Sequence, residues 1–303
     1  MDISLKITMA DPAGNRTAFV EAAVPPSAYA SIGAALLRDT SLRAEQVGFL
    51  CPPLRGAEGR LIMSGGEFCG NASRSFGLLL GRQRGKRAGD TVRIEASGSD
   101  EILTVFLEED GAAISMPLPR GLLPIPLPTE SPPRCTAPPF SMPSFSASQF
   151  SMSSFSAPSG SLSPASVSPQ ALPVVVFDGI AHVIAEKLPP SQALAEQLIG
   201  TVQRQLRPDA AGAIFLSGTQ MTPCVWVRET GSLIWESSCG SGTLAAAFVR
   251  GQSVRDGSFR LSLRQPGGIL TAVLEKENDR VLRAQLSGPV SLEAPVIRTI
   301  TII

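Results

Sequence analysis

The chain of 303 residues contains one sequence pattern twice. The first copy places Cys69 in EFCGNASRSFGLLLG and is followed by ILTVFLE, which begins at Ile102. The second copy places Cys239 in SSCGSGTLAAAFVRG and is followed by ILTAVLE, which begins at Ile269. The two cysteines are 170 residues apart and the two isoleucines 167, so the spacing changes by only three residues. This indicates an internal duplication, and a chain of this length can form two domains that each bury a core.

A segment rich in proline and serine separates the two copies. Residues 124–173 include 12 prolines and 14 serines, a composition typical of disordered chain. We therefore predict a first domain over residues 1–123 and a disordered linker or insertion over 124–173. The second domain is predicted over 174–303, and its last strand is a candidate to return to the first domain.

Alternating apolar and polar residues predict mostly antiparallel strands in both copies, for example in TVRIEAS and in FRLSLRQ. One helix is predicted directly after each cysteine, over 70–80 and over 240–250. The apolar runs LLL and LAAAFV predict that these two helices are largely buried, as if wrapped by a sheet. Further helices are predicted over 27–38 and over 191–206. The expected fold class is therefore α+β.

Composition limits the partners of the chain. The 26 basic residues balance the 26 acidic residues, so there is no basic excess of the kind that indicates a nucleic-acid partner. The N-terminal sequence lacks the pattern of a secretory signal, and no apolar run has the length of a membrane span. We therefore expect a cytoplasmic protein with no membrane partner. The five cysteines are widely spaced and form no CxxC pair, which favours reduced thiols over a zinc site or a disulfide framework.

Scarce residue types narrow the chemistry. His182 is the only histidine, so a cluster of imidazole ligands is excluded, and we expect a structural or surface role for it. None of the four lysines lies in a motif that suggests a Schiff base, and we expect no cofactor. Cys51, Cys135 and Cys224 are expected to be structural or linker thiols. Trp235 is expected in the core, with a place beside a pocket as the alternative.

Cys69 and Cys239 each precede a glycine and small polar residues at a predicted strand-to-helix junction. This places each sulfur at a helix N-terminus, where free N–H groups and the helix dipole favour an anion. We therefore expect a lowered thiol pKa and a place for a substrate carboxylate. A pseudo-twofold arrangement puts the two thiols on opposite sides of one bound molecule. One sulfur can then remove an α proton while the other returns a proton to the opposite face, which is a two-base racemisation.

The strings DPAGN, MSGGEFCGNAS, WESSCGSGT and RQPGG together resemble the diaminopimelate-epimerase-like superfamily, and within it the histidine racemases. The resemblance covers both copies of the pattern but not the segment rich in proline and serine. It implies two pseudo-symmetric domains, each with a curled, mostly antiparallel sheet around a central helix, and an active site between them. It also implies a cofactor-independent racemase that supplies D-histidine to an opine-type metallophore pathway.

The resemblance assigns roles to single positions. Cys69 and Cys239 match the two acid/base groups of the family. Five further positions match residues that hold the α-carboxylate and amino group of the substrate or shape the helix ends, namely Asn15, Gly70, Asn71, Gly240 and Ser241. Glu45 and Glu236 match acidic residues of the racemases, for which a role in binding the amine or the side chain of the substrate is expected.

Two departures separate this chain from neighbouring families. Diaminopimelate epimerases usually carry Glu-Arg ahead of the second cysteine, whereas Ser237 follows Glu236 here, so the arginine expected to hold a distal carboxylate is missing. Proline racemases usually have a histidine after the first Cys-Gly, where this chain has Asn71. Histidine is therefore the preferred substrate, with diaminopimelate or another amino acid as the alternative. Two alternatives belong to other functional classes: a non-catalytic amino-acid-binding protein and a thiol-redox protein. The sequence does not fix the oligomeric state, for which a homodimer is one option.

Overall fold

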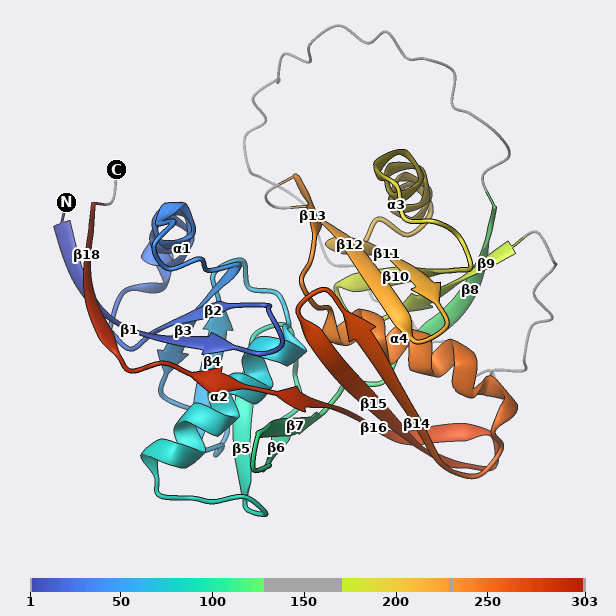
Figure 1. The fold of residues 1–303 in the computed structure, drawn as a ribbon. Coiled ribbons are helices and arrows are strands. Elements are labelled where there is room, and N and C mark those ends of the chain that lie inside the picture. Colours follow the sequence, from blue (N-terminus) through green and yellow to red (C-terminus); the bar gives the residue numbers. More distant parts are fainter. Residues whose placement is uncertain (1, 128–170, 229–230, 302–303) are drawn as a thin grey trace, which may run out of the picture.

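The computed structural model describes residues 2–127, 171–228 and 231–301 (Figure 1). The first half, residues 2–115, contains strands β1 Asp2–Asp11, β2 Thr17–Val20, β3 Gln46–Cys51, β4 Gly59–Met63, β5 Thr91–Ala96, β6 Leu103–Leu107 and β7 Gly111–Ser115, with helices η1 Pro26–Ala28, α1 Tyr29–Arg38 and α2 Gly70–Gln83. The second half, residues 121–289, contains β8 Gly121–Pro126, β9 Ala171–Val176, β10 Ile180–Glu186, β11 Ala210–Ser217, β12 Gln220–Val227, β13 Ser232–Trp235, β14 Gly257–Gln265, β15 Gly268–Glu277 and β16 Arg280–Pro289, with α3 Gln192–Leu206, α4 Gly240–Arg250 and η2 Gly251–Ser253. Strands β17 Ser291–Leu292 and β18 Val296–Thr301 follow.

The order of strand pairing is the same in both halves. Strands β2 and β3 are parallel and joined through α1, as β10 and β11 are parallel and joined through α3. In the first half, β3 then pairs with the antiparallel strand β4, and β4 pairs with the parallel strand β5. In the second half, β11 pairs with the antiparallel strand β12, and β12 pairs with the parallel strand β14. An antiparallel meander completes each set, β5-β6-β7 or β14-β15-β16. The structure is thus a mostly antiparallel α+β fold whose topology repeats, as the duplicated sequence predicted.

All four predicted α-helices are present. Helix α4 has the predicted bounds, α2 extends three residues beyond its predicted end, and α3 begins one residue late. The predicted start at Ser27 falls in the 3₁₀ turn η1, after which α1 begins at Tyr29. Pro25 and Pro26 suit such a start because their fixed φ angles are compatible with a helix and their missing N–H groups have no intrahelical partner there.

Helices α2 and α4 each pack against the strands of their own half. Helix α2 contacts β1, β4, β5, β6 and β7, and α4 contacts β9, β10, β11, β14, β15 and β16. Glycines allow α2 to come close to the sheet: a Cβ at Gly77 would lie 2.4 Å from a methyl carbon of Val105, so no larger residue fits. One central apolar cluster includes residues of both helices. This packing holds the first residues of α2 and α4 in fixed positions.

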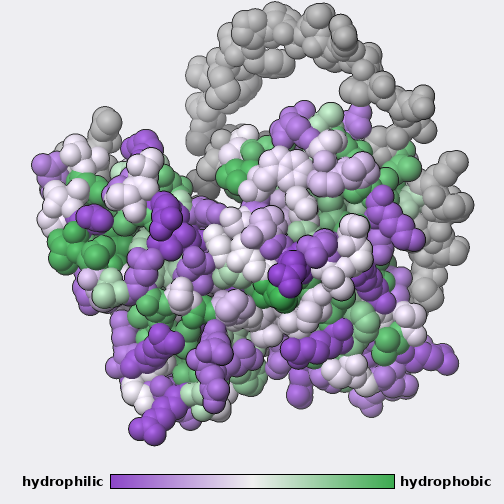
Figure 2. All heavy atoms as spheres, viewed as in Figure 1, coloured by the Kyte–Doolittle hydropathy of each residue, from purple (hydrophilic) through white to green (hydrophobic). Residues whose placement is uncertain are grey.

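Helices α1 and α3 cover the other side of the sheet strands. Helix α1 packs on β3 and β18 over a cluster that includes Leu5 and Ile32, and α3 packs on β10 and β11 over a cluster that includes Leu198 and Cys224. Strongly hydrophilic residues are distributed over the whole face shown in Figure 2. Among the described residues, no helix combines the length and the apolar character needed to cross a membrane.

Two long connections join the halves. Strand β16 pairs with β15 and then, over Gln285–Pro289, with β7 of the first half. Strand β18 crosses back and pairs with β1, so both ends of the described chain lie side by side (Figure 1).

The predicted linker over residues 124–173 divides into three parts. Its ends lie in β8 and β9, which pair with each other so that Pro126 is opposite Ala171. Residues 128–170 lie outside the described residues. The boundary expected at residue 123 falls within β8, because β8 adds to the sheet of the second half through β9. Independent folding of the two domains stays a prediction.

Candidate active site

Cys69 and Cys239 occupy the same place in the two halves. Each is the N-cap residue of its helix, with φ and ψ of −127° and 111° at Cys69 and of −125° and 112° at Cys239. The Cys69 Sγ accepts a hydrogen bond from the backbone N–H of Ala72 at 3.4 Å. At Cys239 the corresponding backbone N–H, that of Gly242, also acts on the sulfur, and the Ser241 hydroxyl lies 3.6 Å from it. The backbone of the duplicated motif is therefore repeated closely, whereas the surroundings of the two sulfur atoms differ.

The starts of α2 and α4 meet at Leu286. A Cβ at Gly70 would lie 3.3 Å from the Leu286 Cδ2, and one at Gly240 would lie 2.5 Å from the same atom. The position of the Gly240 Cβ is also 3.7 Å from the Asn71 Oδ1. A side chain after either cysteine would displace Leu286, and a Cβ at Gly70 would also lie 2.9 Å from the Met116 sulfur. Any contact that Gly70 and Gly240 make with a substrate is therefore made by their backbone.

A hydrogen-bonded network connects the predicted binding residues across the two halves. The Asn71 side-chain amide donates to Ser238 O and Oγ at 3.3 and 3.2 Å and to the Asn15 Oδ1 at 3.4 Å. The Asn15 amide donates in turn to Glu45 at 3.1 Å. Ser237, which stands where a diaminopimelate epimerase usually has arginine, donates to the other Glu45 oxygen at 2.6 Å. The structure thus brings Asn15, Glu45 and Asn71 together with the loop that precedes Cys239.

The DPAGN and RQPGG strings lie against each other beside this network. A Cβ at Gly14 would come within 2.6 Å of the Gly267 Cα, so both positions need glycine. Gly267 N–H donates to Ser237 O at 2.8 Å. Gln265 accepts the backbone N–H of Cys239 at 2.8 Å. The glycines of QPGG turn β14 into β15 and also hold the loop on which Cys239 lies.

Glu236 acts on both cysteines. Burial, together with the nearby Glu45 carboxylate, raises the pKa of Glu236 to about 7, although a hydrogen bond from the Cys239 thiol opposes this. The Glu236 charge raises the pKa of Cys69 and of Cys239 alike. This carboxylate therefore lies within electrostatic reach of both sulfur atoms.

The expectation of a lowered thiol pKa is wrong for this structure. Burial raises the pKa of Cys69 to about 12, with further contributions from Glu236 and Glu67. Burial also raises the pKa of Cys239 well above its ordinary value. Backbone N–H groups at both helix starts act in the expected direction, but the cost of placing a charge away from water is larger. Both thiols are therefore protonated at neutral pH.

Two polar partners of the cysteines were not predicted. The Cys69 thiol donates to the Gln46 Oε1 at 3.0 Å, and Gln46 directly follows Glu45 in the sequence. On the other side, the Ser241 Oγ is 3.6 Å from the Cys239 Sγ and 2.8 Å from the His182 Nε2. The sequence shows only that Ser241 follows Cys239 by two residues, as Asn71 follows Cys69. Contacts between residues so distant in the chain leave no local pattern.

His182 is buried, so of the two expected roles the surface role is wrong. Its side chain has no exposed area, and burial lowers its pKa to about 3, which keeps the imidazole neutral. The ring occupies space that Gly212 leaves open, because a Cβ there would lie 2.2 Å from the His182 Nδ1. Among the described residues, the hydrogen bond of His182 toward the site is the one to Ser241.

The remaining singled-out residues lie away from the two cysteines. Cys51 contacts the Tyr29 hydroxyl at 3.2 Å, Cys224 is buried in the cluster under α3, and Cys135 lies outside the described residues. The Trp235 indole donates to Gln192 at 2.9 Å and its ring centroid is 5.8 Å from that of Phe215. Trp235 therefore packs on the α3 side of the sheet, but it is 39% exposed, so the core position expected for it is wrong.

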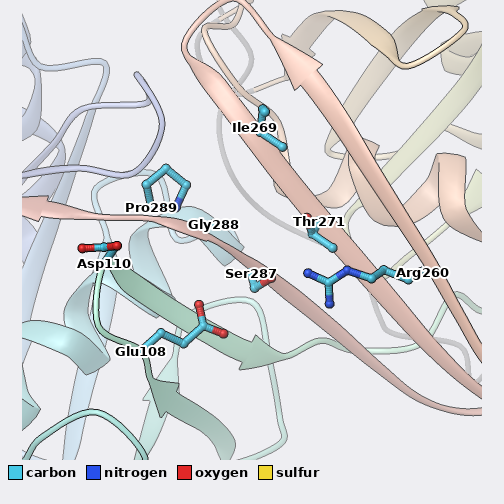
Figure 3. A pocket seen from close by; sticks show the side chains of 8 residues that line it. All are labelled: Glu108, Asp110, Arg260, Ile269, Thr271, Ser287, Gly288 and Pro289. Carbon is cyan, nitrogen blue, oxygen red and sulfur yellow. The ribbon is translucent and has the colours of Figure 1, made fainter.

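A hollow of about 320 Å³ lies between the β6–β7 turn and strands β14, β15 and β16 (Figure 3). Glu108 and Asp110 line it from the β6–β7 turn, and Arg260 lines it from β14. It contains neither cysteine. The residues described here include no group of three or more His, Cys, Asp or Glu side chains placed to hold a metal ion.

Comparison with known proteins identifies the family. The model of the histidine racemase CntK N-terminal domain matches residues 4–131 and 150–295. A histidine racemase of Fusobacterium nucleatum is 30% identical over 298 residues, which cover 94% of this chain and 93% of that protein. A histidine racemase of Staphylococcus aureus is 23% identical over 291 residues, covering 94% and 93% of the two chains.

Solved structures show the same fold at much lower identity. A hydroxyproline epimerase of Agrobacterium vitis, solved with bound trans-4-hydroxy-L-proline, superposes with a TM-score of 0.57 at 12% identity, over 98% of this chain and 92% of that one. At this identity the likeness concerns the fold alone. Because the family model matches most of the sequence, this chain belongs to the CntK histidine racemase family.

Proposed function

We propose that this chain interconverts L- and D-histidine without a cofactor, with Cys69 and Cys239 as the two acid/base groups. The family membership and the curated relatives named histidine racemase support the reaction and the substrate. The observation that carries the mechanism is the placement of two thiols at matching helix starts, whose first residues meet at Leu286. A pair of identical groups suits a reaction that runs in both directions.

The helix starts supply the binding site for the α-carboxylate. Backbone N–H groups in the first turns of α2 and α4 have no carbonyl partner within their helices, and the two helix dipoles add positive potential there. As the α proton leaves, negative charge spreads onto the carboxylate, and preorganised N–H groups stabilise that charge. Glu45, held by Asn15 and Ser237, is placed to bind a cationic group of the substrate.

Because both thiols are protonated, a base must first deprotonate one of them, and Glu236 is that base. Its carboxylate accepts the proton of Cys239, to which it is already hydrogen-bonded, and leaves a thiolate. The thiolate removes the α proton from one face of the substrate, and the Cys69 thiol gives its proton to the opposite face. The product has the opposite configuration, with Cys239 protonated, Cys69 a thiolate and the first proton still on Glu236. Return of the Glu236 proton to the Cys69 thiolate through solvent restores the starting state, and the reverse reaction follows the same steps backwards.

Proton exchange at Cα tests this function. Purified protein is incubated with L-histidine in D₂O without added cofactor, and the products are separated by chiral chromatography with mass detection. D-histidine that carries deuterium at Cα is the expected result. A panel of diaminopimelate and the other protein amino acids runs in parallel, because turnover of one of these alone would leave the reaction class intact and overturn the substrate.

Four finer features are part of this proposal. Each half places one buried helix against a curled sheet, which supports a fold of the diaminopimelate-epimerase type. Supply of D-histidine to a metallophore pathway, a cytoplasmic location and a homodimer stay predictions from the sequence.

A further inference from the structure

Among the described residues, Arg74 is the largest side chain that is fully buried, and it lies on α2 five residues after Cys69. Its Nε donates to the Asn71 Oδ1 at 3.2 Å, and its Nη1 donates to the carbonyls of Gly288 and Pro289 at 2.6 and 3.1 Å. Its Nη2 is buried without a hydrogen-bond partner among the described residues. The guanidinium thus joins the start of α2 to the part of β16 that crosses between the halves.

This guanidinium is a buried charge without a counter-charge. No ion pair among the described residues includes Arg74, and the atoms that accept its hydrogen bonds are neutral oxygens. Burial lowers the pKa of Arg74 to about 10, which leaves it charged at neutral pH. Its position in the first half of α2 is unfavourable too, because the positive end of the helix dipole lies nearby. A buried charge of this kind is costly unless an anion compensates for it.

Two acidic groups act on Arg74, and only one of them is in the interior. Cys69 and Glu108 both raise the pKa of Arg74 against the effect of burial. Glu108 is exposed to solvent at the hollow in Figure 3, where water screens its charge. Cys69 is half-buried at the start of the same helix. The anion available in the interior is therefore the thiolate that Cys69 becomes when it gives up its proton.

We propose that Arg74 is a positioning residue whose buried charge stabilises the thiolate of Cys69. It acts partly through Asn71. The backbone N–H of Asn71 points at the Cys69 sulfur, and the bond from Arg74 to the Asn71 Oδ1 turns the side-chain NH₂ group toward Ser238. The negative charge of a Cys69 thiolate raises the pKa of Arg74, so the charged forms of the two groups favour each other. The inference rests on the proposed acid/base role of Cys69.

Alkylation of the folded protein tests the proposal. Wild type, Arg74→Met and Arg74→Lys are treated with iodoacetamide at one neutral pH, and the modified peptides are quantified by mass spectrometry over time. Methionine keeps the apolar volume and removes the charge, whereas lysine keeps the charge. We expect Arg74→Met to slow alkylation of Cys69 about tenfold, since a tenfold change corresponds to one pKa unit. Arg74→Lys should stay within about threefold of wild type.

Cys51 is the internal reference, because it lies by Tyr29 and away from Arg74. Unchanged Cys69 alkylation in a folded Arg74→Met protein would overturn the proposal. If Arg74→Met does not fold, Arg74→Lys decides. Arg74→Lys retains the charge. If this variant loses Cys69 reactivity to the same extent as its melting temperature falls, the role of Arg74 is merely structural. Alkylation requires no turnover, so a protein that fails to racemise histidine can still support or refute the role of Arg74.

Discussion

The environments of Cys69 and Cys239 differ more than their backbones do. Cys69 is half-buried, and its thiol donates to the Gln46 amide oxygen. Cys239 is buried, with Ser241 and then His182 on one side and Glu236 on the other. The reaction is symmetric at Cα, but a substrate with one side chain is not. The repeated backbone therefore gives two equal helix starts, whereas the different side chains around them make the site asymmetric.

Replacing either cysteine by serine gives the largest expected effect. Cys69→Ser and Cys239→Ser should each lower racemisation by about 10³-fold or more, because each face of the substrate loses its only proton-transfer group. Deuterium exchange is measured from each pure enantiomer separately. Exchange should persist for one enantiomer in Cys69→Ser and for the other in Cys239→Ser. The same enantiomer exchanging in both variants would refute the assignment of one sulfur to each face.

Glu236→Gln should lower kcat/KM by about 10²-fold, because it removes the group that accepts the Cys239 proton. Glu45→Gln is the matched control and should act mainly on KM.

The pH dependence of the free energy of unfolding provides a second measurement on Glu236. The pKa of Glu236 is about 7 in the folded protein, whereas its ordinary value is 4.5. The folded protein therefore holds this proton more tightly than the unfolded chain does. The resulting contribution to folding stability is complete below pH 4.5 and is lost as the pH rises through about 7.

The melting temperature of wild type should therefore fall relative to that of Glu236→Gln as pH rises from 4.5 to 7. Parallel curves for the two proteins would show that the Glu236 carboxyl is not perturbed in the folded state.

Ser241→Ala should have a moderate effect confined to one side of the site. The Ser241 hydroxyl lowers the pKa of Cys239, so its removal should slow alkylation of Cys239 about threefold to tenfold and leave Cys69 unchanged. Ser241→Thr keeps the hydroxyl and should restore the rate. Equal slowing at both cysteines would mean that the two environments are coupled more strongly than their hydrogen bonds indicate.

The segment between β8 and β9 is present in the second half only and gives the smallest expected effect. Pro126 and Ala171 are paired neighbours, so residues 128–170 can be replaced by a short glycine-serine link without moving either strand. We expect kcat/KM within about twofold of wild type, since the deletion leaves β8, β9 and their register unchanged. A large loss of activity in a folded deletion variant would give this segment a role in the site.

Sequence patterns were sufficient for the features that depend on neighbouring residues. Apolar periodicity and the Cys-Gly junctions located α2 and α4 to within three residues, and the repeat predicted the repeated topology. The Gln46 partner of Cys69 and the His182 partner of Ser241 could not be predicted, because both residues reach the site from strands far away in the sequence.

The thiol pKa was mispredicted for a related reason. A helix N-terminus is visible in a sequence, whereas the extent of burial and the placement of Glu236 arise only from packing.

The pairing of β18 with β1 has a consequence for synthesis of the protein. Ile300 belongs to the apolar cluster beneath α1, together with Leu5 from the opposite end of the chain. The first half made by the ribosome therefore waits for the last residues before its sheet edge is covered and that cluster is closed. Contacts between such distant residues form slowly, because the long intervening chain must first be brought together. The sheet edge formed by β1 is thus completed only after residues 296–301 have been made.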